Sequence, residues 1–375
     1  MKHLPFTALQ EKFKSSLKND SGSAILKHLN RIRFVKGHMF MSITMEELAK
    51  LANVSQGAVS LVLNGKAKGQ ISQKKQDLIR ALAKEHNYRI NMAAKGLRKQ
   101  RQYAVGVIMP GNLNLFYASL LTLLQKNFSD RGYVTLFSFV LGENFDNLCN
   151  SLYERQVDGI ISWMDSPLLS DNGIPAVVFD DEQHSDAAVQ TGKLRRCGFD
   201  FRDSYRELFN YLWDLGHREI GFLGNTGDIR CHLLRSFLLE KGLTINENCF
   251  FHHLDDLAGN NELFDKLLTM PERPTALVTT NDETARQLIS EGVRLGIKFP
   301  DDISIAGFMN LPYTANMYPA LTTLDSKNEE LARTMTDILL SMIETPESTV
   351  NDIFIRPELI IRNSCGQPAI TGGKK

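Results

Sequence analysis

The sequence predicts an N-terminal all-α helix-turn-helix headpiece followed by an α/β domain of two Rossmann-like subdomains. Three observations lead to this prediction. Capping and turn residues delimit short amphipathic helices from Thr44 onward. Short apolar runs alternate with helical patterns from Tyr103 onward, as in parallel βαβ units. Lys and Arg are concentrated ahead of that second region.

The first helix of the headpiece is predicted to begin after Thr44. Glu47 stands three residues later, where its side chain can complete a capping box with the Thr44 backbone. Leu48 and Leu51 give this helix its apolar side. Asn53, a residue that tolerates the left-handed conformation, then ends the helix and begins the turn.

A second helix is predicted over 56–63, with Ser55 as its N-terminal cap. Val59 and Val62 can pack inward, which leaves other side chains of this helix facing outward. A third helix begins after Ser72, and its apolar side consists of Leu78, Ile79, Leu82 and Ala83. Three short helices with apolar sides can together enclose one small core.

Length, composition and cysteine spacing limit the class of protein. A chain of 375 residues exceeds one average domain, and 43% hydrophobic with 23% charged residues is ordinary for globular protein. We find no apolar run of about 18 residues and no apolar core of an export signal at the N-terminus. The 5 cysteines are scattered without a CxxC spacing, so we expect reduced thiols in a cytoplasmic protein.

The formal net charge of zero hides an asymmetry along the chain. Residues 1–102 hold about twenty Lys and Arg against about six Asp and Glu, so the remainder is acidic by the same margin. A solvated basic surface is the plain interpretation. A basic segment that also carries a helix-turn-helix favours nucleic acid as its partner.

The headpiece and the segment after it resemble the lac repressor (LacI/GalR) family of bacterial transcription regulators. The matching segments are 44–55, 59–64, 87–88 and 91–98, in that order. With the strands and helices that follow, the resemblance covers about residues 43–364. It implies a DNA-binding headpiece and a periplasmic-binding-protein-like effector domain.

Five segments are therefore expected. Residues 1–42 form an N-terminal extension, 43–90 the headpiece, 91–102 a hinge helix and linker, 103–364 the effector-binding and dimerisation domain, and 365–375 a tail. Within the large domain, we expect one subdomain at about 103–198 with 322–345, and the other at about 199–321 with 346–364.

The extension, residues 1–42, has two interpretations. The family usually begins near the residue that matches Ile43, so translation could start at Met39 or Met41, and we favour this interpretation. The alternative is a basic arm that adds phosphate contacts. A short amphipathic helix in this segment is indicated by Leu26, Leu29 and Ile32.

The second helix of the headpiece matches the family's recognition helix. The N-terminal residues of such a helix reach base edges in the major groove, where the amide of Gln56 suits adenine and the methyl of Ala58 suits thymine. Leu61 replaces the family's usual arginine at a base-contacting position, so we expect a different operator. The headpiece residues expected to contact DNA are Thr44, Ser55, Gln56, Gly57, Ala58, Ser60, Leu61, Asn64, Lys66 and Lys68. The last two lie in a loop, Gly65–Ile71, that looks longer than in the lac repressor.

Residues 91–98 resemble the family's hinge helix. The leucine that matches Leu97 wedges into a minor-groove step, because leucine can unstack bases without a hydrogen-bond partner. Ala94 is small enough for two hinge helices to meet. So short a helix is marginal alone and should order only with DNA and a second subunit. The remaining expected contacts, mostly of cations with phosphates, come from Asn91, Lys95, Arg98, Lys99 and Arg101.

The large domain is predicted from its apolar runs. We expect strands at 103–109, 134–139, 157–162, 176–179, 219–223, 276–279 and 303–307, and a helix near 117–132. A ligand in such a fold lies in the cleft outside the carboxyl ends of the strands.

Candidate effector-binding residues follow several of these strands. Arg230 and Asp282 match the family's ligand-binding arginine and aspartate. Such a pair suits sugar hydroxyls, because one side chain donates and the other accepts hydrogen bonds in pairs. An aromatic ring can pack on the apolar face of a pyranose. The candidates are Asn114, Phe116, Tyr117, Asp165, Arg230, Asp282 and Asn310.

These predictions describe a cytoplasmic, homodimeric transcription regulator. It would repress carbohydrate-utilisation genes by binding an inverted-repeat operator, double-stranded DNA, under control of a sugar in the cleft. A nucleobase- or nucleoside-responsive regulator of the same architecture is the alternative, followed by a solute-binding protein. We find no metal-ligand spacing or catalytic constellation, so neither a cofactor nor an enzyme is expected.

Overall fold

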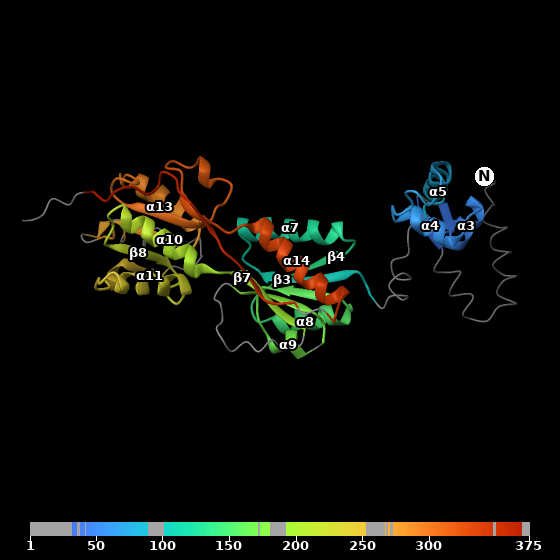
Figure 1. Cartoon of the computed structure of the whole chain (residues 1–375), viewed down its shortest axis with the longest axis horizontal. Helices are drawn as coiled ribbons and strands as arrows, with labels where there is room; N and C mark the ends of the chain where they lie inside the picture. The colour runs from blue at the N-terminus through green and yellow to red at the C-terminus, as the bar shows by residue number, and fades with distance from the viewer. Residues whose placement is uncertain are drawn as a thin grey trace, which may run out of the picture. The chain divides into compact units, whose positions relative to one another are not determined.

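The computed structural model describes residues 32–35, 38–41, 43–88, 101–171, 173–180, 193–252, 267, 269–270, 273–347 and 350–369. The chain divides into two compact units, Met1–Lys95 and Gly96–Lys375. Figure 1 labels the helices and strands of both units. Within the described residues, no helix is long and apolar enough to cross a membrane.

The first unit contains the three predicted headpiece helices, α3 (Met45–Ala52), α4 (Gln56–Leu63) and α5 (Gln73–Glu85). Their core includes Leu48, Val59, Val62 and Ile79, each at most 2% exposed. Thr44 and Glu47 form the predicted capping box, and Asn53 ends α3 in the left-handed region with φ 49°. The local capping signals of the sequence are therefore confirmed.

Two leucines that were expected in this core are exposed instead. Leu51 on α3 is 53% exposed and Leu78 on α5 is 45% exposed. A single helix buries only the stripe that faces its neighbours, and in α3 that stripe runs through Leu48, Ala49 and Ala52.

Ahead of the headpiece, β1 (Ile32–Val35) and β2 (His38–Met41) pair as an antiparallel hairpin. The expected amphipathic helix is therefore wrong at Ile32, which lies in β1. Leu26 and Leu29 lie outside the described residues.

The second unit contains two six-stranded sheets. The first sheet is parallel throughout and has the order β13-β7-β6-β5-β3-β4. Its strands are β3 (Ala104–Pro110), β4 (Val134–Val140), β5 (Gly159–Ser162), β6 (Ala176–Asp180), β7 (Leu194–Phe199) and β13 (Ile353–Ile355).

The second sheet has the order β14-β12-β11-β10-β8-β9, and only the edge strand β14 is antiparallel to its neighbour. Its strands are β8 (Ile220–Gly224), β9 (Phe250–His252), β10 (Ala276–Thr279), β11 (Ser304–Met309), β12 (Thr322–Asp325) and β14 (Glu358–Ile360). All seven predicted strands are confirmed, with boundary shifts of about two residues at most.

Helices cover both faces of each sheet, because successive side chains of a strand point to opposite faces. In the first sheet, Val107 and Val177 pack toward α7 (Leu115–Asp130) and α14 (Asn328–Glu344). Their neighbours Ile108 and Val178 pack toward α8 (Phe145–Glu154) and α9 (Pro167–Asp171). Figure 1 shows α7 and α14 side by side on one face and α8 and α9 on the other.

The second sheet follows the same rule. Phe222 and Val278 share a core with α10 (Phe201–Asp214) and α11 (Ile229–Glu240), whereas Leu223 and Leu277 pack with α13 (Asp282–Arg294). Two short 3₁₀ turns, Glu247–Cys249 and Thr314–Asn316, complete the described elements of this half. All 5 cysteines of the chain are buried free thiols.

Strand pairing corrects parts of two expected subdomain assignments. Residues 322–345 were assigned to the first subdomain; α14 packs on the first sheet as expected, yet β12 pairs with β11 in the second sheet. Residues 346–364 were assigned to the second; β14 pairs with β12 there as expected, yet β13 pairs with β7 in the first sheet. Sheet membership is decided by backbone hydrogen bonds, which an apolar run in the sequence does not reveal. The chain thus crosses between the sheets after β7, after β12 and after β13.

Candidate functional site

The recognition helix α4 presents polar and small side chains without any charge. Gln56 and Gly57 are exposed at its first turn, and its sequence, QGAVSLVL, contains no acidic or basic residue. Ser55 caps the helix by accepting a hydrogen bond from the Ala58 backbone N–H at 3.2 Å. The four N-terminal backbone N–H groups of a helix otherwise lack partners, so this cap stabilises the end that carries Gln56.

Four other headpiece residues that were expected to contact DNA also make contacts within the headpiece itself. The Asn64 amide donates to the Ser60 carbonyl oxygen at 2.7 Å and to the Ser60 hydroxyl at 3.2 Å. Leu61 is half-buried and packs against the headpiece core. Thr44 caps α3 and its hydroxyl donates to Glu47 at 2.9 Å. Each keeps exposed atoms, but the orientation of each is set by these internal contacts.

The loop Gly65–Ile71 carries the positive charges nearest to α4 in the sequence. Lys66 and Lys68 are exposed, whereas Ala67 between them is only 1% exposed and belongs to the headpiece core. Gly65 and Gly69 have φ of 72° and 79°, a region that glycine adopts without strain. The loop is thus a folded structure with its two lysines directed outward.

The expected hinge contacts lie outside the described residues: Asn91, Ala94, Lys95, Leu97, Arg98 and Lys99. Arg101 is described, and its guanidinium donates to the Ile343 carbonyl oxygen at 2.6 Å. Carbonyl groups in the last turn of a helix lack partners within the helix, so this contact caps α14. Arg101 therefore has a contact within the protein, and its expected contact with DNA phosphates stays a prediction.

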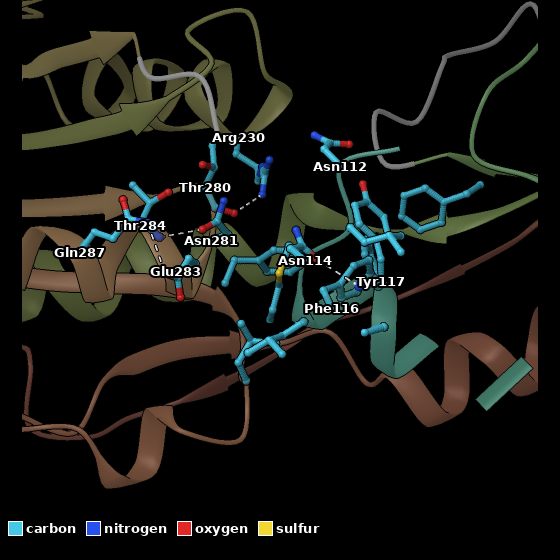
Figure 2. A pocket seen from close by; sticks show the side chains of 18 of the residues that line it. Asn112, Asn114, Phe116, Tyr117, Arg230, Thr280, Asn281, Glu283, Thr284 and Gln287 are labelled. Carbon is cyan, nitrogen blue, oxygen red and sulfur yellow. Dashed lines mark hydrogen bonds between the residues drawn. The ribbon is translucent and has the colours of Figure 1, made fainter. Parts of the chain in front are cut away.

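A cavity of about 770 Å³ lies between the two sheets of the second unit. Figure 2 shows it from close by, with Asn112, Asn114 and Tyr117 on one side and Arg230, Thr280 and Asn281 on the other. Three of the seven expected effector residues line it through the first turn of α7: Asn114, Phe116 and Tyr117. Asn114 also caps α7, since its side chain accepts from the Tyr117 N–H at 3.1 Å.

Aromatic rings form much of the cavity wall. Phe179, Phe199, Phe201 and Phe308 line it together with Phe116 and Tyr117. Phe199 contacts Phe308 edge-on, with ring centroids 5.4 Å apart, and Phe201 contacts Phe308 at the same distance. Edge-to-face contacts of this kind fix the rings relative to one another.

Arg230, the fourth expected residue that lines the cavity, is bound to other protein groups. Its guanidinium pairs with Asp228 and donates to the Thr280 carbonyl oxygen at 2.7 Å. Its carbon centre lies 5.2 Å from the Phe201 ring and 5.4 Å from the Phe308 ring. Burial alone would raise the pKa of Asp228, but the bonds from Arg230 outweigh it and hold that pKa below its ordinary value.

Glu283, the acidic residue of the cavity wall, is paired in the same way. Its carboxylate accepts from Arg286, from the Tyr313 hydroxyl at 2.9 Å and from the Gln287 amide at 3.3 Å. Burial raises the pKa of Glu283, but the hydrogen bonds from these donors together lower it by more, so the pKa lies below its ordinary value. Both charged groups of the described cavity wall are therefore neutralised by protein partners.

Asp282 is not among the cavity-lining residues. It is 0% exposed, and its carboxylate accepts from the Leu311 N–H at 2.8 Å and from the Thr323 hydroxyl at 2.6 Å. Burial raises its pKa to about 7 against the opposing effect of these bonds. Asp282 thus joins α13 to the segment after β11 and to β12 and does not line the cavity, so its expected contact with the effector stays a prediction.

Asn310 and Asp165 also lie elsewhere. The Asn310 amide donates to Asp325 at 3.0 Å and accepts from Arg362 at 2.6 Å, with φ 52° at Asn310 itself. Asp165 pairs with Arg196 at 2.5 Å. Each residue follows a strand, as the sequence predicted, but its side chain contacts a protein partner and does not line the cavity.

Sequence reasoning missed several cavity residues. Asn281 follows β10 directly, as Asp282 does, and its side chain caps α13 by accepting from the Thr284 N–H at 2.8 Å. Its position in the Asn-Asp pair after a predicted strand was the available signal. The other missed residues of the wall are Asn112, Leu113, Leu115, Ala118, Phe179, Phe199, Phe201, Thr280, Glu283, Thr284, Gln287, Phe308, Met309 and Leu311.

The described residues contain no cluster of His, Cys, Asp or Glu that could hold a metal ion. The cavity wall presents aromatic rings, amides and hydroxyls. Such groups bind and orient a ligand by stacking and by paired hydrogen bonds.

Two family models match the chain. Residues 44–91 match the bacterial regulatory proteins of the lacI family, and residues 209–365 match a periplasmic binding protein-like domain. The chain is 27% identical over 341 residues to the HTH-type transcriptional repressor PurR of Aliivibrio salmonicida, covering 86% of this chain and 98% of the relative. It is 28% identical over 345 residues to the PurR repressor of Vibrio parahaemolyticus, with the same coverage.

Solved structures share the fold. The lac repressor dimer bound to operator and the anti-inducer ONPF has a TM-score of 0.70 at 21% identity, covering 86% of this chain and 98% of the repressor. The regulator CelR in complex with cellobiose has a TM-score of 0.62 at 22% identity, covering 86% and 99%. A regulator from Enterococcus faecium with bound ribose has a TM-score of 0.62 at 22% identity, covering 70% and 99%.

The predicted fold class is confirmed by the headpiece, the two sheets and these matches. The chain is a member of the LacI family of bacterial regulatory proteins, a DNA-binding transcriptional repressor and not an enzyme, which acts in the cytoplasm and carries a periplasmic-binding-protein-like effector domain.

Proposed function

We propose that this repressor binds an inverted-repeat operator as a homodimer and controls carbohydrate-utilisation genes in response to a neutral sugar in the cavity. The observation that carries the ligand class is the internal pairing of Arg230 with Asp228 and of Glu283 with Arg286. A charged ligand would have to break one of these pairs, because the described wall offers no other acidic or basic side chain.

A sugar suits the remaining wall. Aromatic rings line the cavity, among them Tyr117, Phe179 and Phe308, and such a ring can pack on the apolar face of a pyranose. The amides of Asn112, Asn281 and Gln287, with the hydroxyls of Thr280 and Thr284, can each both donate and accept, as ring hydroxyls require. Solved structures of the same fold in complex with cellobiose and with ribose are consistent with this class.

A nucleobase or nucleoside is the second candidate. The specific observation in its favour is the combination of six aromatic side chains with four amide side chains in one wall: Phe116, Tyr117, Phe179, Phe199, Phe201 and Phe308 with Asn112, Asn114, Asn281 and Gln287. A planar base stacks between rings, and its edge presents donors and acceptors that an amide can match in pairs.

A ligand screen separates these classes. Thermal unfolding of the full-length protein would be measured with neutral mono- and disaccharides, sugar phosphates, nucleobases and nucleosides. We expect a raised melting temperature with a neutral sugar, lost in a Phe308→Ala variant, and no response to sugar phosphates. A response confined to nucleobases would overturn the sugar assignment, and a response confined to sugar phosphates would overturn the neutral cavity.

For DNA, we propose that Gln56, Gly57, Ala58 and Leu61 read base edges and that Thr44, Ser55, Ser60, Asn64, Lys66 and Lys68 contact phosphates or groove edges. The hinge residues Asn91, Ala94, Lys95, Leu97 and Arg98 complete the proposal. Operator selection from genomic fragments, followed by Gln56→Ala, tests it. Each lost bidentate base contact should cost about 1–3 kcal/mol on the selected operator and almost nothing on random duplex.

A further inference from the structure

The loop Gly65–Ile71, here called the lysine loop, is fixed to the headpiece by one buried polar side chain. Gln76 on α5 is 8% exposed, and no other described polar residue of the headpiece is classed as buried. Its amide donates to the Ile71 carbonyl oxygen at 2.8 Å and lies 3.5 Å from the Ala67 carbonyl oxygen. One side chain thus holds the middle and the end of the loop together.

The backbone of the lysine loop adds to this constraint. The Lys66 N–H donates to the Leu61 carbonyl oxygen at 2.9 Å, which continues α4 into the loop. The N–H groups of Gln70 and Ile71 both donate to the Ala67 carbonyl oxygen, at 3.1 and 3.2 Å. With the Ala67 methyl in the core and the Gln76 amide behind it, the loop backbone has a defined shape before any ligand arrives.

The recognition helix cannot supply the electrostatic part of DNA binding, because α4 has no charged residue. Neutralising phosphates is what gives DNA binding most of its sequence-independent affinity. Lys66 and Lys68 are exposed on the loop directly after α4. Lysine carries its charge on a flexible stem, so a fixed backbone below it reduces the entropy lost on binding.

We propose that Gln76 is a positioning residue for DNA binding: it holds the lysine loop in one shape so that Lys66 and Lys68 reach phosphates together while α4 lies in the groove. The proposal rests on the proposed assignment of Lys66 and Lys68 to DNA phosphates. Gln76 itself is buried, and its Oε1 also accepts a hydrogen bond from Arg80 at 3.3 Å; the proposed effect on DNA binding runs through the two lysines. A residue that only packs the core would not change how much the two exposed lysines contribute to DNA binding. A positioning residue would change that contribution.

The test is a double-mutant cycle on the full-length protein with a short random-sequence duplex as probe. The slope of log affinity against log salt concentration counts the phosphates neutralised, at about 0.9 per contact. We expect the paired variant Lys66→Gln with Lys68→Gln to lower the slope by about 1–2. In a Gln76→Ala background, the same pair should lower it by less than half as much, because the lysines are already misplaced.

Matched variants separate positioning from folding. Gln73 lies one turn earlier on α5, is exposed, and donates to Asp77 on the same helix at 2.9 Å, so Gln73→Ala should leave the cycle unchanged. Gln76→Glu keeps the shape of the side chain but cannot donate to two carbonyl groups, and it should reproduce the coupling seen with alanine. Far-UV circular dichroism of each variant reports the folded headpiece, and Gln76→Glu serves if the alanine variant does not fold.

The outcomes are distinct. If the lysine pair leaves the slope unchanged in an otherwise unaltered protein, the assignment of these lysines to phosphates fails and the inference falls with it. If the pair lowers the slope equally with and without Gln76, the lysines bind phosphate independently and only the inference is overturned.

Discussion

Charged side chains are placed differently in the headpiece and in the effector domain. In the headpiece, the described core is apolar except for Gln76, and the lysines stay on the surface. In the effector domain, the charged side chains of Arg230 and Asp228 are largely buried and paired with each other. A surface that meets a polyanion needs its cations solvated and available, whereas a cavity for a neutral ligand needs its charges already paired.

The largest expected effect comes from breaking a buried pair. The side chains of Arg230 and Asp228 are only 10% and 15% exposed, so Arg230→Met leaves a carboxylate without its cation. We expect a loss of about 3–5 kcal/mol in the free energy of unfolding of the effector domain. Urea unfolding followed by tryptophan fluorescence measures it, because Trp163 and Trp213, the 2 tryptophans of the chain, both lie in this domain.

The control for that variant is the Arg206–Glu240 pair of the same domain, whose side chains are 53% and 52% exposed. Arg206→Met should cost less than about 1 kcal/mol, because water replaces the lost partner. Equal losses in the free energy of unfolding for the two arginine variants would show that burial does not determine the cost of breaking an ion pair.

A second variant tests the close approach that holds Asp282. A Cβ added at Gly307 would lie 2.3 Å from the Asp282 carboxylate and 3.0 Å from the Leu321 side chain. We expect Gly307→Ala to lower the free energy of unfolding by about 1–3 kcal/mol. Gly227→Ala is the matched control, because its Cβ would meet only Asn225 at an ordinary 3.5 Å. An unaltered stability for Gly307→Ala would mean that the carboxylate can move freely.

The third prediction concerns pH. The pKa of Asp282 is raised from 3.8 to about 7, so the folded protein holds this proton over a range in which the unfolded chain has lost it. Its contribution to stability is present at low pH and is lost as pH rises from about 4 to about 7, by at most about 1.4 kcal/mol per pH unit. Relative to the natural protein, Asp282→Asn should therefore gain stability steadily as pH rises through this window. A difference that is constant with pH in urea unfolding would contradict the buried carboxylate.

The smallest effect is expected at the N-terminal cap of α4. Ser55→Ala removes the bond to the Ala58 N–H and should destabilise the headpiece by about 1 kcal/mol. Ser72 stands at the same place before α5 but makes no side-chain capping bond, so Ser72→Ala should change little. Hydrogen exchange of the backbone amides in α4 and α5 measures both. Equal effects of the two substitutions would remove the capping bond as the explanation.

The local features of the headpiece could be predicted from sequence because their causes lie within a few residues. The Thr44–Glu47 capping box, the left-handed Asn53 and the Ser55 cap each depend on spacing alone. The exposure of Leu51 and Leu78 could not be predicted this way, because it depends on how wide a face the neighbouring helix covers.

The cavity was predicted only in part because it combines segments from both sheets. Asn114, Phe116 and Tyr117 could be located from their place after β3. Asp282 could not, because its direction depends on Gly307 and Thr323, which lie far from it in sequence. The remaining aromatic wall comes from strand ends whose ring contacts no spacing rule reveals.

The three crossings of the chain between the sheets also affect the order of synthesis on the ribosome. Because α14 and β13 complete the first sheet, its apolar face toward α14 stays uncovered until nearly the whole polypeptide has emerged. The headpiece helices share one core formed within about forty residues of sequence, so this local packing lets them form first. We therefore expect a nascent chain to contain a folded DNA-binding headpiece well before its effector domain can fold.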